Sequence, residues 1–198
     1  MARVSALDDA NGARAYGAAI LRGERVYLRE LRDDDLPLLV KWWNDPQAAA
    51  LQTFVVRPQP ESTIVEKYRA WSVNKESTGA WFSIVAQEDD GLVGQVSLFG
   101  AQVPTRAATL AISIGPEHWS RGLGTDALRV MVRYGFQELG LNRIGLGVWA
   151  FNDRAIAAYR KVGFIEEGRR RQMTFHAGRF HDEVLMSILR SEWSEAST

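Results

Sequence analysis

One stretch of the sequence, residues 107–139, restricts the fold more than any other. An apolar strand is expected over Ala107–Ile114, followed by Gly115-Pro116, a glycine-containing loop and an amphipathic helix that continues to Leu139 before Gly140. The helix has a polar stripe at Asp126, Arg129, Arg133 and Gln137 and an apolar face at Leu128, Met131, Val132, Gly135 and Leu139. Because the first amides of a helix lack partners within it and carry partial positive charge, this arrangement suits an anion such as phosphate.

The glycine-containing loop does not match the common nucleotide-binding patterns. The pattern Gly-x-Gly-x-x-Ala, typical of dinucleotide-binding loops, occurs twice. It is found at Gly122–Ala127 and, inside a predicted strand, at Gly145–Ala150. A dinucleotide fingerprint needs its first glycine close after a strand and an acid at the end of the next strand, and both conditions fail. No Gly-Lys-Ser/Thr follows either, which excludes the nucleoside-triphosphate loop. A plain tight turn remains one interpretation of Gly122 and Gly124, whose missing Cβ atoms also allow an anion to approach the backbone.

Further segments give the loop a more specific interpretation. Arg121–Ala127 resembles the pyrophosphate loop of the GCN5-related N-acetyltransferase (GNAT) superfamily. Asn152–Phe164 resembles the second signature of that superfamily: an Asn, a short helix that carries Tyr159, and Gly163-Phe164. The segments that resemble its ribosomal-protein-alanine and spermidine acetyltransferase branch are Val26–Leu36, Glu166–Arg169 and Gly178–Asp182. The resemblance extends from Leu21 to Leu189.

The order of elements predicts an α/β (α+β) fold. Strands are expected at Arg25–Leu31, Ala80–Gln87, Leu92–Phe99, Ala107–Ile114, Ile144–Val148, from Phe164 onward, at Gln172–Phe175 and at Arg179–Leu189. Further helices are expected after Asp33–Asp35 as far as Trp43, from a Thr63–Glu66 capping box to Lys75, and over Asp153–Val162. Hairpin-linked strands followed by one that arrives through a helix give a mixed sheet. The resemblance implies a mostly antiparallel sheet of about seven strands, splayed between the fourth and fifth, with helices on both faces.

Composition narrows the function classes. The 198 residues suit one domain, and a formal net charge of zero argues against nucleic acid or an anionic membrane as a partner. The absence of cysteine excludes disulfides and a thiolate nucleophile, and three scattered histidines do not suggest a metal site. No apolar run approaches the ~20 residues of a membrane span, and the N-terminus has no signal-peptide core, so a cytoplasmic protein is expected.

We divide the chain into a flexible N-terminal arm (residues 1–21), an N-acetyltransferase domain (22–190) and a polar tail (191–198). An alternative for the arm is packing on a partner subunit, which would make the protein a homodimer. Gln47–Pro60 has no clear period and is either an irregular surface loop or a wall of the acceptor pocket.

The resemblance implies acetyl-coenzyme A as the acyl donor and no metal. The pantetheine arm of the coenzyme would pair like an extra strand beside Ile112, Ser113 and Ile114. The residues implied at the pyrophosphate are Ser120, Arg121, Gly122, Leu123, Gly124 and Thr125. Further contacts are implied at Asn152, Ala155, Tyr159 and Lys161, although Asn152 also suits a helix cap.

Catalysis is assigned to Tyr159 and Ser113. Spacing alone would make Tyr159 a core residue, whereas the resemblance makes it the general acid that protonates the leaving thiolate. Many GNAT relatives carry an acid in the strand before the glycine loop, and Ala107–Ile114 has none. The candidates for the base are therefore Ser113, His118, Glu30 or a water chain. Arg169–Arg171 is interpreted as a solvated strand edge, or alternatively as a basic run that attracts an acidic acceptor or the ribose phosphate of the coenzyme.

The predicted function is direct transfer of an acetyl group from acetyl-coenzyme A to a primary amine. The acceptor would be a protein N-terminus, a polyamine or a small-molecule amine. The missing strand acid keeps one alternative open: a non-catalytic acyl-coenzyme sensor or protein-binding module on the same fold.

Overall fold

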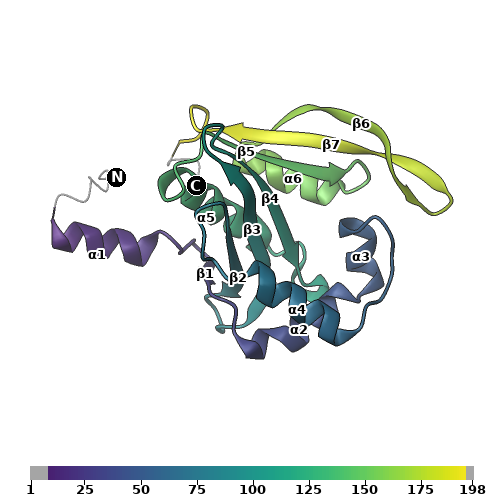
Figure 1. Cartoon of the computed structure of the whole chain (residues 1–198), viewed down its shortest axis with the longest axis horizontal. Helices are drawn as coiled ribbons and strands as arrows, with labels where there is room; N and C mark the ends of the chain where they lie inside the picture. Colours follow the sequence, from purple (N-terminus) through teal and green to yellow (C-terminus); the bar gives the residue numbers. More distant parts are fainter. Residues whose placement is uncertain (1–8, 195–198) are drawn as a thin grey trace.

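The computed structural model describes residues 9–194, so residues 1–8 of the predicted arm and 195–198 of the predicted tail lie outside it. A seven-stranded sheet in the order β1-β2-β3-β4-β5-β7-β6 forms the centre of the molecule (Figure 1). The strands are β1 Val26–Arg29, β2 Ala80–Ala86, β3 Leu92–Gln102, β4 Ala107–Ile114, β5 Arg143–Trp149, β6 Ile165–His176 and β7 Arg179–Leu189. The helices are α1 Ala10–Ala19, α2 Leu36–Trp43, α3 Pro46–Gln52, α4 Glu61–Trp71, α5 Leu123–Gln137 and α6 Asp153–Val162, with 3-10 turns at Asp33–Asp35 and Pro116–His118.

The predicted splay lies between β4 and β5, the parallel pair of the sheet. The two strands pair at three positions, the last of which joins Thr109 to Gly145. Beyond that position β4 stays paired with β3 as far as Ile114, while β5 stays paired with β7 as far as Trp149. The predicted fold class, a mixed and mostly antiparallel sheet that opens between the fourth and fifth strands, is therefore confirmed.

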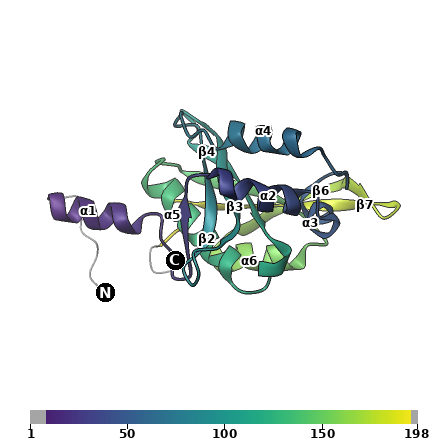
Figure 2. The ribbon, with the colours of Figure 1, turned by 90° about the horizontal axis from the view of Figure 1, so that it is seen from below.

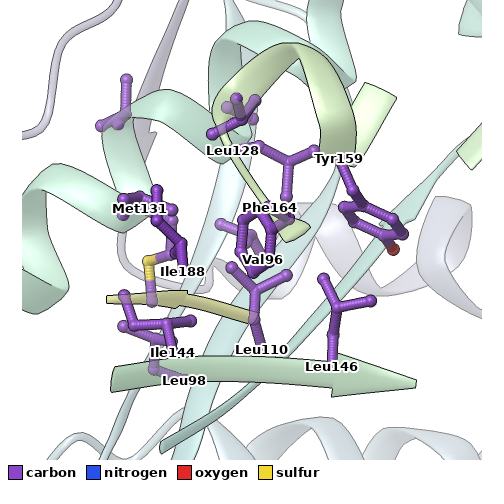
Figure 3. Packing of buried hydrophobic residues seen from close by; sticks show 14 of the residues in the cluster. Val96, Leu98, Leu110, Leu128, Met131, Ile144, Leu146, Tyr159, Phe164 and Ile188 are labelled. Atoms are coloured by element: carbon purple, nitrogen blue, oxygen red, sulfur yellow. The ribbon is translucent and has the colours of Figure 1, made fainter. Parts of the chain in front are cut away.

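Helices cover both faces of the sheet, as the resemblance implied. Figure 2 shows α4 on one side of the sheet and α6 on the other. The larger core lies against α5 and α6, where Met131 lies close to Ile144 of β5 and Ile188 of β7 (Figure 3). A smaller cluster joins α2 and α4 to the opposite face through Leu36, Leu39, Trp42, Ile64, Tyr68, Trp81 and Leu92. Apolar burial of this kind is the main term that holds helices to a sheet.

Two helix predictions are wrong in detail. Pro46–Gln52, expected to be irregular, forms α3, because the Asp45 side chain accepts hydrogen bonds from Gln47 N and Ala48 N and Pro46 suits the first helical position. The capping box predicted at Thr63 does not form. Helix α4 starts at Glu61 after Pro60 and ends at Trp71, before Lys75.

The N-terminal segment and β6 also differ from the prediction. Ala10–Ala19, expected to be frayed, forms α1, which Asp9 caps and which projects from the body (Figure 1). Arg133 of α5 donates hydrogen bonds to the carbonyl oxygens of Ala19 and Arg22 at 2.8 and 2.6 Å and holds its base. Strand β6 is one element from Ile165 to His176, with register shifts where a break was expected. The division into arm, domain and tail stays a prediction.

Asp126 is buried, although its place in the polar stripe of α5 predicted a solvent-facing residue. Its side chain is 4% exposed and accepts hydrogen bonds from the backbone N–H groups of Glu24, Arg25 and Val26, at 3.2, 2.8 and 3.0 Å. One carboxylate therefore joins the start of β1 to the first turn of α5 and fixes that helix end beside the splay.

Within residues 9–194, no helix combines the length and the apolar character that a membrane span requires.

Candidate active site

A pocket of about 660 Å³ lies where β4 and β5 diverge. Strand β4 contributes Leu110, Ala111, Ile112 and Ile114 to its wall, and β5 contributes Gly147, Val148 and Trp149. The first turn of α5, one side of α6 and the segment that follows α3 complete the wall. The separation of the two parallel strands therefore creates the space, and elements from both halves of the chain surround it.

The start of α5 lines this pocket with backbone N–H groups that have no acceptor inside the helix. Gly122, at the N-cap, has φ +80°, and no side chain of the described residues caps the helix. A left-handed N-cap at this φ is strained for most other residues, and a Cβ on Gly122 would lie 3.0 Å from Arg25 Nη1. Gly124 is packed closely too, since its Cβ would lie 3.2 Å from Ile114 Cγ1. The uncapped amides and the helix dipole make this end of the pocket an anion cradle.

A cationic side chain that the sequence did not single out lies near the cradle. The guanidinium of Arg154 is 3.9 Å from the ring centroid of Trp119, and both residues line the pocket. Trp119 Nε1 donates to Ile114 O at 2.7 Å, which ties its indole to the end of β4. Partial burial lowers the pKa of Arg154 from its ordinary value, but the group remains charged. The sequence did contain a signal for Arg154, because it shares one face of α6 with Ala158 and the predicted site residue Lys161.

Tyr159 lines the same pocket from α6 and is 8% exposed. Figure 3 shows it at the margin of the core, with its hydroxyl directed away from Phe164. Burial raises the pKa of the Tyr159 hydroxyl to about 12, because the phenolate would lose its hydration. Tyr159 is therefore a protonated hydrogen-bond donor at neutral pH.

The structure brings most of the predicted site residues together. Those that line the pocket are Ile112, Ile114, Ser120, Gly122, Gly124, Thr125, Asn152, Ala155, Tyr159 and Lys161. Asn152 also caps α6, since its Oδ1 accepts from Ala155 N at 3.3 Å. Three predicted residues are not among the lining residues: Ser113, Arg121 and Leu123. Arg121 Nη2 lies 3.4 Å from Glu88 Oε2 at the surface, and Leu123 is 3% exposed within the core.

The other candidate bases have different positions. His118 lines the pocket, where its ring packs edge-on against Trp42 and burial lowers the pKa of the imidazole. Glu30 is exposed, pairs with Arg32 and does not line the pocket. In the basic run of β6, Arg169 pairs with Glu166 of the same strand and Arg170 pairs with Glu183 of β7.

The remaining wall of the pocket comes from segments far apart in the sequence. Leu51, Gln52 and Phe54 reach it from α3 and the turn after it, so Gln47–Pro60 contributes to the wall of the pocket. That this wall holds the acceptor stays a prediction. Phe54 packs edge-on against Trp149 with ring centroids 5.1 Å apart, and His176 of β6 lies 3.0 Å from Thr53 O. Gln95 of β3 and Glu183 of β7 add polar side chains. The sequence analysis did not single out Glu183, and alternation along β7 could not have shown its closeness to β5.

Comparison with known proteins agrees with this geometry. A model of the acetyltransferase (GNAT) domain matches residues 25–165. The chain belongs to the GNAT family. This confirms the predicted resemblance and identifies the protein as an acetyltransferase.

Relatives within the GNAT family include polyamine enzymes. The spermidine N(1)-acetyltransferase of Escherichia coli (strain K12) is 33% identical over 172 residues, which cover 87% of this chain and 84% of that protein. A crystal structure of spermidine N-acetyltransferase from Vibrio cholerae in complex with CoA and spermine has a TM-score of 0.75 at 27% identity. The match covers 84% of this chain and 96% of that one. A structure of spermidine N-acetyltransferase from Vibrio cholerae described as dodecameric has a TM-score of 0.70 at 26% identity, with 87% and 98% covered.

Proposed function

We propose that this GNAT protein transfers an acetyl group from acetyl-coenzyme A directly to a primary amine. The observation that carries the proposal is the pocket at the β4–β5 splay, which brings the uncapped start of α5 and the buried hydroxyl of Tyr159 to one space. Acetyl transfer from this coenzyme requires an anion cradle, which would hold its phosphates, and a proton donor, which would protonate the leaving sulfur.

The residues present fit the acyl donor. Backbone amides between Ser120 and Thr125 would hold the two linked phosphates, and Arg154 and Lys161 would add positive charge. Beyond Thr109 the side of β4 that faces β5 has no strand partner within residues 9–194, so the amide groups of pantetheine would pair there, near Ile112 and Ile114. The thioester supplies the activated acetyl group.

Tyr159 would act as the general acid. Its hydroxyl stays protonated at neutral pH and would donate to the sulfur as the carbon–sulfur bond breaks. A positioned proton donor of this kind contributes about 10²- to 10⁴-fold to the rate of a reaction. Holding amine and thioester together in one pocket would supply a further part of the rate.

A cationic amine is the acceptor that we favour, because relatives over most of this chain are spermidine acetyltransferases. A polyamine is one member of this class, and a protein N-terminus or a small-molecule amine are others. We also propose that the protein works as a homodimer or larger oligomer in the cytoplasm, with neither nucleic acid nor a membrane as its partner and no metal in the reaction.

Two measurements test the proposal. Isothermal titration should detect binding of acetyl-coenzyme A, and thiol release should rise when a primary amine from a panel is added. Binding without transfer to any amine, and without slow thioester hydrolysis, would favour the alternative of a non-catalytic acyl-coenzyme sensor. Absence of binding would overturn both.

A further inference from the structure

An amine acceptor presents a problem that the residues assigned so far leave open. At neutral pH an alkylamine is an ammonium ion, so it must lose a proton before its nitrogen can attack. Strand β4 carries no acid, Ser113 does not line the pocket and Glu30 lies outside it. His118 does line the pocket, where its ring packs edge-on against Trp42 at the 3-10 turn after β4, and a carboxylate that lines the pocket is a further candidate for the group that receives this proton.

Among the described residues that line the pocket, Glu183 supplies the one carboxylate. It lies on β7 opposite Trp149 of β5, on the sheet face away from the core residues Val184 and Met186. Its side chain is 12% exposed. Burying a carboxylate to this degree costs free energy unless a partner compensates its charge, and a cation provides that compensation.

The two oxygens of Glu183 have different surroundings. Oε2 accepts a hydrogen bond from Arg170 Nη1 at 3.0 Å, which fixes the orientation of the group. Oε1 lies over Gly147, so closely that a Cβ built on this glycine would overlap it. Gly147 lines the pocket itself. The absence of a side chain on Gly147 therefore leaves room for the carboxylate at the wall of the pocket.

Neighbouring groups suit a cation as well. The rings of Trp149 and Phe54, 5.1 Å apart, line the pocket with Glu183, and aromatic faces attract ammonium groups. Gln95 Oε1, a hydrogen-bond acceptor, is buried at the same pocket without a partner in the part of the chain that the structure describes. Two acceptor oxygens and two aromatic rings from β3, β5, β7 and the turn after α3 thus line the same pocket.

We propose that Glu183 binds the ammonium group of the acceptor through Oε1 and takes a proton from it. The inference rests on the proposed function. The free amine then forms the new carbon–nitrogen bond while the carbon–sulfur bond breaks. Of the three ammonium protons, one passes through Glu183 to water, one stays on the amide nitrogen, and one is released to water. The thiolate receives the proton of Tyr159, whose oxygen recovers one from water.

The test compares Glu183→Gln, which keeps the size of the side chain, with Glu166→Gln as the matched control. Glu166 is also a carboxylate with arginine partners, but it lies on β6 and does not line the pocket. In Glu183→Gln we expect kcat/KM for an alkylamine to fall about 10²-fold or more, within the range of a lost general base. The affinity for acetyl-coenzyme A, measured by titration, should stay within about twofold in both variants.

A second acceptor separates a chemical role from a structural one. An aromatic amine that is uncharged at the assay pH needs no deprotonation before attack, so Glu183→Gln should lose much less activity with it than with the alkylamine. Gly147→Ala provides an independent variant, because its methyl group displaces the Glu183 carboxylate without removing it, and it should show the same difference between the two amines.

The possible results distinguish this inference from the proposed function. A wild-type protein that transfers acetyl groups, with Glu183→Gln equally active on the alkylamine, would overturn the role of Glu183. An equal loss with both amines would do the same, because it would indicate damage to the pocket in general. A wild-type protein that transfers no acetyl group to any amine would instead refute the proposed function.

Discussion

At the scale of single residues, burial decides which form of an ionisable group the protein holds. The phenol of Tyr159 is removed from water, and this burial raises its pKa to about 12. Asp35 is buried too, but hydrogen bonds from Arg29, Arg32 N and Ser83 surround it. Burial alone would raise the pKa of Asp35, and these bonds outweigh it and lower the value.

Replacing Tyr159 by phenylalanine should remove the proton donor and keep the packing. We expect kcat to fall about 10²-fold or more, while the affinity for acetyl-coenzyme A changes little. Because the pKa of Tyr159 is about 12, wild-type turnover should show no alkaline loss from this group at moderately alkaline pH. Steady-state kinetics and titration check both statements. Unchanged turnover in the variant would remove Tyr159 from the acid role.

Asp35→Asn should destabilise the protein, because it leaves the guanidinium of Arg29, a partner at 2.7 Å, without its countercharge. Loss of one partner of a buried ion pair costs about 3–5 kcal/mol. The folded pKa of Asp35 is depressed, so its stabilisation is complete above the unfolded value of about 3.9 and is lost as the pH falls through the lower folded value. Urea unfolding should show the full difference at pH 7 and a smaller one in acid. A difference independent of pH would contradict this account.

At the scale of elements, a few polar residues fix how helices and strands meet around the pocket. The carboxylate of Asp126 accepts three backbone N–H groups at the start of β1, and thereby fixes the first turn of α5. At the other end of the cradle, Trp42 of α2 donates to Glu117 Oε2 at 3.0 Å and packs over Gly115, where a Cβ would overlap its ring. The position of the anion cradle therefore depends on contacts outside the glycine loop.

Asp126→Ala should detach β1 from α5, since it leaves buried backbone donors unpaired at about 1–3 kcal/mol each. We expect a loss of at least about 2 kcal/mol in urea unfolding, faster hydrogen exchange at Val26 N–H, and weaker binding of acetyl-coenzyme A. Asp153→Ala is the matched control, because Asp153 is an exposed acid in the first turn of α6. Equal effects of the two changes would show that the contacts of Asp126 with β1 are unimportant.

At the scale of the whole molecule, the splay leaves two groups of strands joined by a short parallel contact. Strands β1–β4 and the β5-β7-β6 group pair through three positions of β4 and β5, and the pocket lies between them. A ligand that contacts both groups binds the folded state alone. Folding stability and ligand binding are therefore coupled.

Acetyl-coenzyme A should accordingly raise the melting temperature of the whole chain. At a ligand concentration of 100 times Kd the stabilisation is about 2.7 kcal/mol, and it should grow with the logarithm of the concentration. Differential scanning fluorimetry over a ligand series measures this. A single cooperative transition that the ligand does not shift would count against a site between the two groups of strands.

The N-terminal helix bears on assembly. Helix α1 has no buried residue in the described part of the chain. It contacts the body through Tyr16, which donates to Glu138, and through the carbonyl oxygen of Ala19, which accepts from Arg133 of α5. If the arm packs on a partner subunit, light scattering should give a dimer or larger oligomer for the full chain and a smaller mass after removal of residues 1–20. An unchanged mass would place the subunit contact elsewhere.

Local patterns in the sequence were sufficient for the elements and the family. The periods of α5 and α6, the alternation of the strands and the Arg121–Ala127 and Asn152–Phe164 segments depend on neighbouring residues, so they could be read directly. The order of the elements predicted the mixed sheet. The resemblance carried by the two segments implied the splay and the coenzyme site, and the family match confirms the resemblance. The helical content of residues 10–19 and 46–52 was missed because side-chain caps at Asp9 and Asp45 outweighed weak periodicity.

Only the tertiary structure decided which side chains share the pocket. Glu183, Arg154 and Phe54 come from separate elements, and their proximity depends on how the sheet opens beyond Thr109. Asp126 shows the same limit. A polar stripe predicts that its side chain faces solvent, but it cannot show that three backbone N–H groups from about a hundred residues earlier in the chain donate to that side chain. The physical reason is that periodicity records the face of an element, whereas a site is made by contacts between elements.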